Sequence, residues 1–592
     1  MKKYIYILSL VIGALLYSCE ETLNVAPKNI MQDEAIFNSD AGIEAYLASL
    51  YNSIPMYSFE STGISWGNGG LPAPEYVSEM LSACFWVELQ NFSAFFSQVG
   101  KWNEAYKGIR NTTNFISKIE SASISQNDIP KYLAEAKVIR AWYNNELVRL
   151  YGGVPIITEV LNFTGDNLAD LQVPRNTEKE VYDFILKDID EALPNLNETS
   201  GGGRINKYVA LALKSRAMLY AASSAEFAPV QLDGLVGIPS SEAIRYYQAA
   251  YDAAQAIIDA GKYSLYNSNP DKAQNFTDLF LNTAGNPEVI FLKMYKYPER
   301  CHVWDLAMLP YSQRSPRTYS SNSCPTLEIV EEYEYIDGSD GKLKIADDTG
   351  EPIEYQDPAA VFENKDPRFF GTILYPGSTW RGNPIEIQRG IIDGDQTLIS
   401  GVENDLYKGI PIMGEDGPGN NNGLGTLSGF YLRKYLDPTM SPSDVAYNSD
   451  QDWIVFRYAE VLLNYAEAAF KLNKTADALW AINEIRRRAG IVELSEITED
   501  KIRHERMIEL AFENHRFFDI KRWHVAHEIL SSIKIHGLMP FLVYHEGGDP
   551  GYIFKAEGIG YIRTFHQETD YSLKISDSEI NANPNLVQNP GH

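Results

Sequence analysis

The chain has 592 residues and a net charge of −28, because 79 Asp and Glu outweigh 51 Lys and Arg. A chain of this length can bury a large core, and it carries no basic run that would follow a phosphate backbone. We therefore expect no nucleic-acid partner, and strongly acidic polysaccharides are disfavoured.

The N-terminus carries the pattern of an export signal. Lys2 and Lys3 precede an apolar run at residues 4–16, which is too short to span a membrane and is flanked as a secretory signal is. The sequence Leu-Tyr-Ser-Cys that follows resembles the bacterial lipobox, in which the cysteine thiol is lipidated and becomes the mature N-terminus. It predicts a signal peptide at 1–18 and a lipid anchor on Cys19. The alternative is ordinary signal-peptide cleavage, with Cys19 as a bystander.

Residues 19–262 are predicted to form a helical region. Apolar residues follow helical spacing, and Gly152, Gly153 and Pro155 give one helix a sharp end. The predicted helices begin near residue 41 and include 102–119, 129–151, 177–193, 208–222 and 241–260. Alanines recur at helical intervals in the last two, which lets antiparallel helices stack closely, as in TPR-type repeats. A strict TPR consensus is absent, so the prediction is a repeat-like solenoid of helical pairs.

Residues 263–592 are predicted to form a second region of mixed character. Between 263 and 450 helical periodicity fades, and short strand-like pieces such as EVIFLKMY and GTILY appear. The stretch GEDGPGNNNGLGTLSG at 414–429 predicts a loop, and loops of that length usually carry function. Helices are expected to return at 451–525, before an irregular C-terminal tail. The chain is thus predicted to be mainly α, a TPR-like helical-pair solenoid with a long, loop-rich middle region carrying short strands.

The helical segment between Phe456 and Trp523 combines packing with charge. It predicts three helices, and in the third of them Glu505, Glu509 and Glu513 fall at i, i+4 and i+8, on one face. Like charges at that spacing repel and need cationic partners. The candidate partners are Arg486, Arg487, Arg488 and Arg522.

A row of carboxylates can look catalytic, but this one does not match an enzyme site. A glycosidase needs two carboxyl groups flanking a bond in an open cleft, whereas these alternate with arginines on an amphipathic helix. We interpret them as a structural ion network. His504-Glu505 does not begin a zinc motif, because Ile508 stands where HExxH requires histidine. With no GxSxG, phosphate loop or metal-ligand cluster either, we predict no enzyme, no cofactor and no metal.

Four segments resemble the SusD/RagB family, the surface glycan-binding lipoproteins of Bacteroidetes nutrient-uptake systems. They are LAEAKVIRAWYNNELVRLYGGVPI, GGGRINKYVALALKSRAMLYAAS, the 456–523 segment with FRYAEVLLNYAEAAF and IRHERMIELAFENHRFFDIKRW, and the ending SEINANPNLVQNPGH. Glu20 and Glu21, directly after the predicted lipidated cysteine, resemble the surface-export signal of these lipoproteins. The resemblance covers the mature chain except for the detail of its middle.

The resemblance implies a lipoprotein of the cell outer membrane, facing outside, that binds oligosaccharides without cleaving them. It also implies a partner, a TonB-dependent (SusC-like) transporter that receives the ligand. Two alternatives stay open: a RagB-like uptake lipoprotein that binds peptides, and a glycosidase or peptidase built on a helical scaffold. The sequence does not name the glycan, its linkage or its length.

Sugar binding calls for exposed aromatic rings, on which sugar rings stack, with polar groups at the rim. Four tryptophans lie in or beside irregular, polar segments, and the family's glycan site is similarly formed by loops and helix ends of the early and middle chain. These candidates are Trp66, Trp86, Trp304 and Trp380. Their candidate polar companions are Asn68, Asp305, Arg368 and Arg381, and Tyr311 and Tyr375 are weaker candidates. Each tryptophan has the alternative of being a packed loop anchor.

The remaining tryptophans follow helical patterns and are assigned to the core. They are Trp102, Trp142, Trp453, Trp480 and Trp523. Cysteine pairing stays open: Cys301 and Cys324 can bond across the segment between them, which would leave Cys84 reduced.

Overall fold

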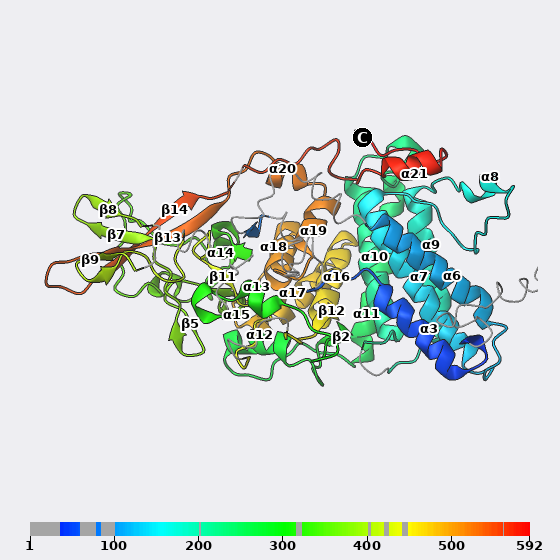
Figure 1. Ribbon diagram of the computed structural model, residues 1–592, viewed down its shortest axis with the longest axis horizontal. Helices are drawn as coiled ribbons and strands as arrows, with labels where there is room; N and C mark the ends of the chain where they lie inside the picture. Colours follow the sequence, from blue (N-terminus) through cyan, green and yellow to red (C-terminus); the bar gives the residue numbers. More distant parts are fainter. Residues whose placement is uncertain are drawn as a thin grey trace, which may run out of the picture.

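The computed structural model describes residues 36–59, 79–83, 101–199, 203–314, 323–400, 404–418, 425–440, 448–560 and 562–592. The molecule is elongated (Figure 1): long helices form one end, a small sheet forms the other, and short elements lie between them. The predicted mainly α, repeat-like fold is confirmed. The predicted Cys19, Trp66, Asn68 and Trp86, together with Cys84, lie outside the described residues.

Except for the short helix α8, which was not predicted, the N-terminal helices lie close to their predicted positions. They are α3 (Asp40–Ser53), α6 (Trp102–Ile119), α7 (Ile129–Tyr151), α8 (Leu168–Leu171), α9 (Glu178–Ala192), α10 (Lys207–Phe227) and α11 (Ala243–Ala260). Helices α6, α7, α9, α10 and α11 pack one against the next in that order and form the helical end of the molecule (Figure 1). Helix α9 begins with a capping box, in which Thr177 and Glu180 each bind the other's backbone N–H.

Small residues allow these helices to approach closely. A Cβ at Gly108 of α6 would stand 2.1 Å from the Tyr143 ring of α7, so only glycine fits this crossing. The alanines predicted to mediate close stacking in α10 are buried, as is Ala253 of α11. Helix α11 then packs on α16, which joins the N-terminal helices to the C-terminal ones.

The second helical block begins with a strand rather than a helix. Residues Trp453–Arg457 form β12, which pairs antiparallel with β2 (Val289–Lys293), the predicted EVIFLKMY strand. The prediction of a helix over this apolar run is wrong, because a short buried strand and a helical turn share the same composition. The helices of this block are α16 (Tyr458–Lys471), α17 (Thr475–Ala489), α18 (Glu499–Glu509), α19 (Arg516–Arg522) and α20 (Ala526–Leu530).

The third predicted helix of this block is interrupted, which corrects the sequence analysis. Helix α18 ends at Glu509, and Phe512 and Asn514 have left-handed φ values of 62° and 67°. That backbone cannot continue an α-helix. Glu513 therefore lies in the connection to α19, not on the helical face that carries Glu505 and Glu509.

In its described residues, the middle of the chain consists of short elements. The helices are α12 (Lys272–Leu281), α13 (Trp304–Met308), α14 (Leu327–Glu332) and α15 (Pro367–Thr372). The paired strands are β1 (Leu81–Ala83) with β3 (Ser323–Pro325), β4 (Ile373–Leu374) with β11 (Tyr431–Leu432), β5 (Thr379–Trp380) with β6 (Asn383–Pro384), and β9 (Leu406–Tyr407) with β10 (Ile410–Pro411). Single 3₁₀ turns occur in this region at Tyr311–Gln313 and Ala360–Phe362. Three more occur among the N-terminal helices, at Leu193–Asn195, Leu232–Gly234 and Ser240–Glu242. This irregular, loop-rich middle agrees with the prediction.

The C-terminal region contains a sheet that the sequence analysis missed. Strands β13 (His536–Val543) and β14 (Gly551–Gly558) form an antiparallel hairpin, and the sheet order is β14-β13-β7-β8, with β7 at Gly390–Asp393 and β8 at Gln396–Leu398. Strand β13 pairs parallel with β7. Glycine and proline inside β13 hid the strand, because both are unfavourable in strand interiors.

After β14 the chain returns to the helical end, where α21 (Asp577–Ala582) lies beside the N-terminal helices (Figure 1). Arg175 donates hydrogen bonds to the carbonyl oxygens of Tyr151 at 2.9 Å and Val587 at 2.6 Å. Asn589 donates to the same Tyr151 carbonyl oxygen at 3.0 Å. Arg175 and Asn589 thus satisfy a backbone carbonyl at the C-terminus of α7.

No disulfide joins Cys301 and Cys324. Within the described part of the chain, no helix combines the length and the apolar character needed to cross a bilayer.

Candidate functional site

Trp304 lies in an aromatic core at the start of α13. Its side chain is 1% exposed, and its Nε1–H donates to the carbonyl oxygen of Lys434 at 3.0 Å. The Phe59 ring lies 4.9 Å away between centroids, and Tyr435 and Trp453 pack edge-on against it. A ring enclosed in this way offers no face to a sugar. The expectation of an exposed platform at Trp304 is wrong, and its alternative, a packed anchor, describes it.

Asp305 is buried beside it and holds three chain segments together. Its carboxylate accepts hydrogen bonds from Ser449 Oγ at 2.8 Å, Gln451 Nε2 at 2.6 Å and the backbone N–H of Asp437 at 2.9 Å. Burial raises the pKa of Asp305 to about 6, although these bonds to the charged form act to lower it. The carboxylate is therefore used inside the protein and does not lie at a rim.

Trp380 ends β5, and Arg381 begins the turn of the β5–β6 hairpin. Trp380 is 3% exposed, and its Nε1 has no hydrogen-bond partner among the described residues. Arg381 is half-buried and donates to the carbonyl oxygens of Pro438 at 3.2 Å and Asp437 at 3.3 Å. Asp305 and Arg381 thus both bind the segment at 437–438, and Arg381 is the one that reaches solvent.

The weaker candidates are also used in packing. Tyr311 is 9% exposed, and Tyr375 is half-buried among Phe362, Phe369 and Phe370. A binding role for Trp66, Asn68 and Trp86 stays a prediction.

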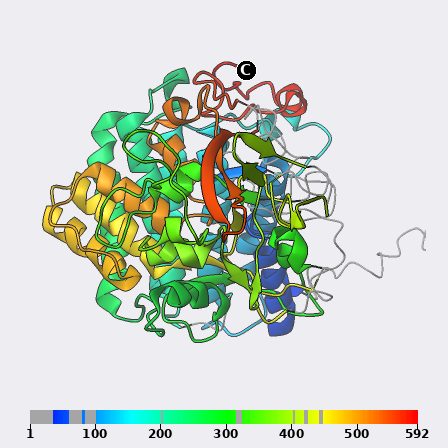
Figure 2. The same cartoon turned by 90° about the vertical axis from the view of Figure 1, so that its left-hand side faces the viewer.

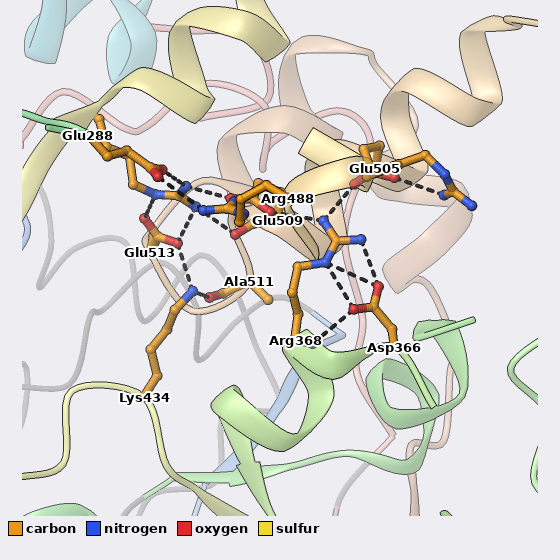
Figure 3. A network of polar contacts seen from close by, with 11 residues as sticks. Glu288, Asp366, Arg368, Lys434, Arg488, Glu505, Glu509, Ala511 and Glu513 are labelled. Carbon is orange, nitrogen blue, oxygen red and sulfur yellow. Dashed lines mark hydrogen bonds and ion pairs between the residues drawn. The ribbon is translucent and has the colours of Figure 1, made fainter. Parts of the chain in front are cut away.

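Arg368 lies far inside the protein, in a network of buried ions (Figure 3). Its side chain is 1% exposed and donates to Asp366 at 2.7 Å, Glu505 at 2.6 Å and Glu509 at 2.9 Å. The expectation that Arg368 bonds sugar hydroxyls at a rim is wrong, because all three carboxylates already occupy its donors.

Glu509 lies at the centre of this network (Figure 3). One carboxylate oxygen accepts from Arg457 at 2.6 Å and from Arg488, and the other accepts from Arg368. Glu513 continues the network to Arg457 and to Lys434, each at 2.7 Å. Glu288 joins Arg457 and Arg488 from the other side. The interpretation of the carboxylate row as a structural ion network is confirmed.

Two of the four predicted cationic partners take part in this network. Arg486 binds Glu505 at 3.0 Å, and Arg488 binds Glu509. Arg487 instead pairs at the surface with Glu484 and Glu493, and Arg522 pairs with Glu467 and Asp519. The partners that the sequence analysis missed are Arg368, Lys434 and Arg457.

The network also fixes the protonation of its carboxylates. Burial alone would raise the pKa of Glu509, but the guanidiniums of Arg488, Arg457 and Arg368 hold it well below the usual value. The pKa values of Glu505 and Glu513 are lowered in the same way. A general acid must carry a proton near its operating pH, so these three carboxylates are unsuited to protonate a leaving group.

Two hollows open near the ends of the first helices and are large enough for a small ligand. One of about 330 Å³ lies between α3 and β2. Arg300 donates to Asn52 at 2.9 Å on its wall, and Arg204 there binds Glu44 and Glu135. The polar groups of this hollow suit hydroxyl recognition.

The second hollow, of about 470 Å³, lies under the C-terminal tail. Burial raises the pKa of Glu178, which accepts from Ser224 and from the Gly237 N–H, each at 2.6 Å. Burial also lowers the pKa of Lys521, on the same wall, to about 8. Both ionisable groups are thus poorly solvated in this hollow.

Trp480 is predicted to lie in the core but is exposed. Its side chain is 42% exposed on α17, whereas Trp142, Trp453 and Trp523 are buried as expected. The buried face of α17 is marked by Ala478, Ala481, Ile482 and Ile485. Helical spacing places position 480 on the opposite side of the helix from these residues, a signal available in the sequence.

The fold and this site define a TPR-like helical scaffold whose central carboxylates form a structural ion network. Comparison with known families agrees. A sequence model described as the SusD family matches residues 287–592, and one described as starch-binding associating with outer membrane matches residues 23–219. The chain belongs to the SusD family.

Individual relatives match along nearly their whole length. The chain is 25% identical to the SusD-like protein P38 of Formosa agariphila, over 90% of this chain and 94% of that one. Among solved structures, a SusD-like carbohydrate binding protein from Bacteroides fragilis is 24% identical, with a TM-score of 0.68 over 93% of this chain and 100% of that one. A laminarin binding SusD-like protein is 20% identical, with a TM-score of 0.60 over 94% and 100%. These structures support the fold.

Proposed function

We propose that this protein binds oligosaccharides at the cell surface and delivers them to a TonB-dependent, SusC-like transporter without cleaving them. Membership of the SusD family carries the proposal. It is supported by the relatives described as carbohydrate binding and laminarin binding. The central carboxylates, held ionised by arginines, support binding over hydrolysis.

We further propose that the glycan contacts lie mainly in the early part of the chain, with Arg381 added from the middle. Of the eight residues predicted to contact the glycan, Trp304, Asp305, Arg368 and Trp380 are at most 3% exposed. Arg381 keeps access to solvent, and Trp66, Asn68 and Trp86 complete the proposed set. The 330 Å³ hollow is lined by residues of 44–56, which directly precede the Trp66 segment in the chain.

Trp66→Ala or Trp86→Ala should weaken glycan binding more than about tenfold, because a lost stacking ring removes about 1–3 kcal/mol of apolar contact. A glycan array identifies the ligand, and calorimetry on the hits measures the loss. The melting curves of both variants should stay unchanged. Normal glycan binding by both variants would exclude the proposed contacts, and binding of peptides in place of sugars would favour a RagB-like function.

Trp304→Phe is the matched control and should behave in the opposite way. It removes the indole N–H and leaves the buried Lys434 carbonyl without its donor, which costs about 1–3 kcal/mol of stability. The melting temperature should fall while glycan affinity stays within about twofold, since the ring has no exposed face. A selective loss of affinity in this variant would return Trp304 to the binding site.

We propose, in addition, that Cys19 anchors the protein to the outer membrane and that the transporter lies beneath it. A stable complex of this kind typically buries about 1,600 Å² or more of surface. After extraction of membranes in mild detergent, a tagged chain should therefore co-purify with a large β-barrel in near-stoichiometric amount. Recovery of the chain alone, from an extract in which other membrane complexes stay intact, would contradict the partnership.

A further inference from the structure

An exposed aromatic surface on α17 is not used by the fold. Trp480 is 42% exposed, while five of the other six described tryptophans, at 142, 304, 380, 453 and 523, are at most 3% exposed. Its ring rests edge-on against Tyr465, at 6.1 Å between centroids and an interplanar angle of 89°. Tyr465 is 4% exposed and bonded to Gln255 and Tyr251, so it gives the indole a fixed support. The indole is thus held from one side and open to solvent on another.

Trp480 forms one wall of a hollow of about 310 Å³. Two further aromatic rings, Tyr458 at the start of α16 and Tyr263 after α11, line the same hollow, and both are half-buried. Asn267, Glu484 and Arg487 add an amide, a carboxylate and a guanidinium. Aromatic rings with hydrogen-bonding groups of both kinds at the rim are the combination that a sugar ring requires.

The charges of this hollow favour a neutral ligand. Arg487 donates to Glu484 at 2.6 Å and to Glu493 at 2.9 and 3.0 Å. Arg488, which also lines the hollow, points inward and pairs with Glu288 and Glu509. Both cations are therefore matched by carboxylates, and an anionic ligand would gain little there. The protein's net charge of −28 acts in the same direction.

The hollow is separate from the one at α3, the first described helix. Figure 2 shows the yellow and orange helices α16 to α18 on one side of the molecule and the blue helix α3 on the other. The hollow shares no described lining residue with the 330 Å³ hollow, which is partly lined by α3 at Glu44 and Tyr51.

We propose that this hollow is a second saccharide site, which holds one or two units of a neutral sugar on the ring of Trp480. The proposal deepens the proposed function and rests on it for the class of ligand. Tyr458 and Tyr263 flank the sugar, and Glu484 and Asn267 bind its hydroxyls. A volume of about 310 Å³ lies at the lower end of the range for small-molecule pockets, which limits the site to a short segment of a longer glycan.

The test is ¹⁹F NMR of protein labelled with 5-fluorotryptophan, in which each indole gives its own signal. Trp480→Phe assigns the signal of interest by removing it. The probes are hexasaccharides of β-1,3-glucan, β-1,4-glucan, α-1,4-glucan, β-1,4-mannan and β-1,4-xylan at millimolar concentration. At least one of them should shift the Trp480 signal in a saturable manner. Tyr458→Ala and Glu484→Ala should each raise the midpoint of that titration, Tyr458→Ala by about tenfold.

Ile244→Ala is the control, since Ile244 is a 59% exposed apolar residue that does not line the hollow. It should leave the midpoint unchanged. If saccharides move other tryptophan signals but never that of Trp480, this second site is overturned and the proposed function stands. If no indole signal responds to any saccharide, both fail together. A Trp480 shift with the same midpoint in the Tyr458→Ala and Glu484→Ala proteins would also overturn the site.

Discussion

Glu509→Gln should lower the free energy of unfolding by about 3–5 kcal/mol, the usual cost of breaking a buried ion pair from one side. Glu509 is fully buried, and its two oxygens accept from Arg368, Arg457 and Arg488. Glutamine keeps the shape but turns one acceptor into an N–H₂ donor, which must face a guanidinium. Urea unfolding followed by circular dichroism measures the loss.

Glu493→Gln is the matched control for this substitution. Glu493 makes the same type of bond, to Arg487 at 2.9 Å, but both side chains are about half exposed. Exposed pairs contribute less than about 1 kcal/mol, so this variant should unfold almost as the parent does. Equal losses in the two variants, or a loss below about 1 kcal/mol at Glu509, would mean that the buried network does not hold the fold together.

Lowering the pH should destabilise the folded protein, because it protonates the carboxylates of the same network. The pKa values of Glu505, Glu509 and Glu513 are lowered in the folded protein, and that of Glu467 is lowered to about 2 because Arg522 and Arg506 outweigh the effect of burial. A carboxyl with a depressed pKa contributes stability that is complete above its unfolded value, about 4.3, and is lost as the pH falls toward the folded value. Stability should therefore decline from about pH 4 to pH 2, and less steeply in Glu509→Gln.

The contribution of Asp305 to stability changes with pH in the opposite direction. Its folded pKa of about 6 lies above the unfolded value of about 3.9, so its stabilising effect is present at low pH and is lost as the pH rises through 6. This window lies above the one in which the glutamates titrate. The decline below pH 4 is thus the part that reports the ion network.

Local sequence patterns were sufficient to predict helices at the helical end of the molecule. The helices at 102–119 and 129–151 were predicted with the boundaries that the structure has, because their apolar faces and end signals agree. Where local signals conflict, prediction failed. Strand β13 contains Gly537 and Pro540, which disfavour a strand. It pairs with β7, which is distant in the chain, and with β14, which the sequence did not identify as a strand.

The site residues were harder to predict for a related reason. Arg368 and Trp304 lie in irregular, polar stretches of sequence, yet their side chains are satisfied by Glu505 and Lys434, more than a hundred residues away. A single sequence shows the charge of an arginine but not which carboxylate it meets. Trp480 shows the converse case, since a helical pattern identifies the helix and does not ensure that every large side chain on it is buried.

Cys19→Ala should move the protein out of the outer membrane almost completely. A lipidated N-terminal cysteine of this type carries more than one acyl chain, which is enough for stable anchoring where a single chain is marginal. Without the thiol no lipid is attached, and the chain should accumulate as a soluble protein or as a precursor that keeps residues 1–18. Fractionation of cells that lack the transporter, with mass spectrometry of the N-terminus, measures both results.

Cys301→Ala provides the matched control, because Cys301 forms no disulfide and lies within the folded body. This variant should stay with the outer membrane at the level of the parent protein and carry the lipid mass on Cys19. The deletion of the transporter matters, since a tight complex would retain even an unlipidated chain at the membrane. Wild-type amounts of Cys19→Ala in the outer-membrane fraction of those cells would show that another feature anchors the chain and that the lipobox assignment is wrong.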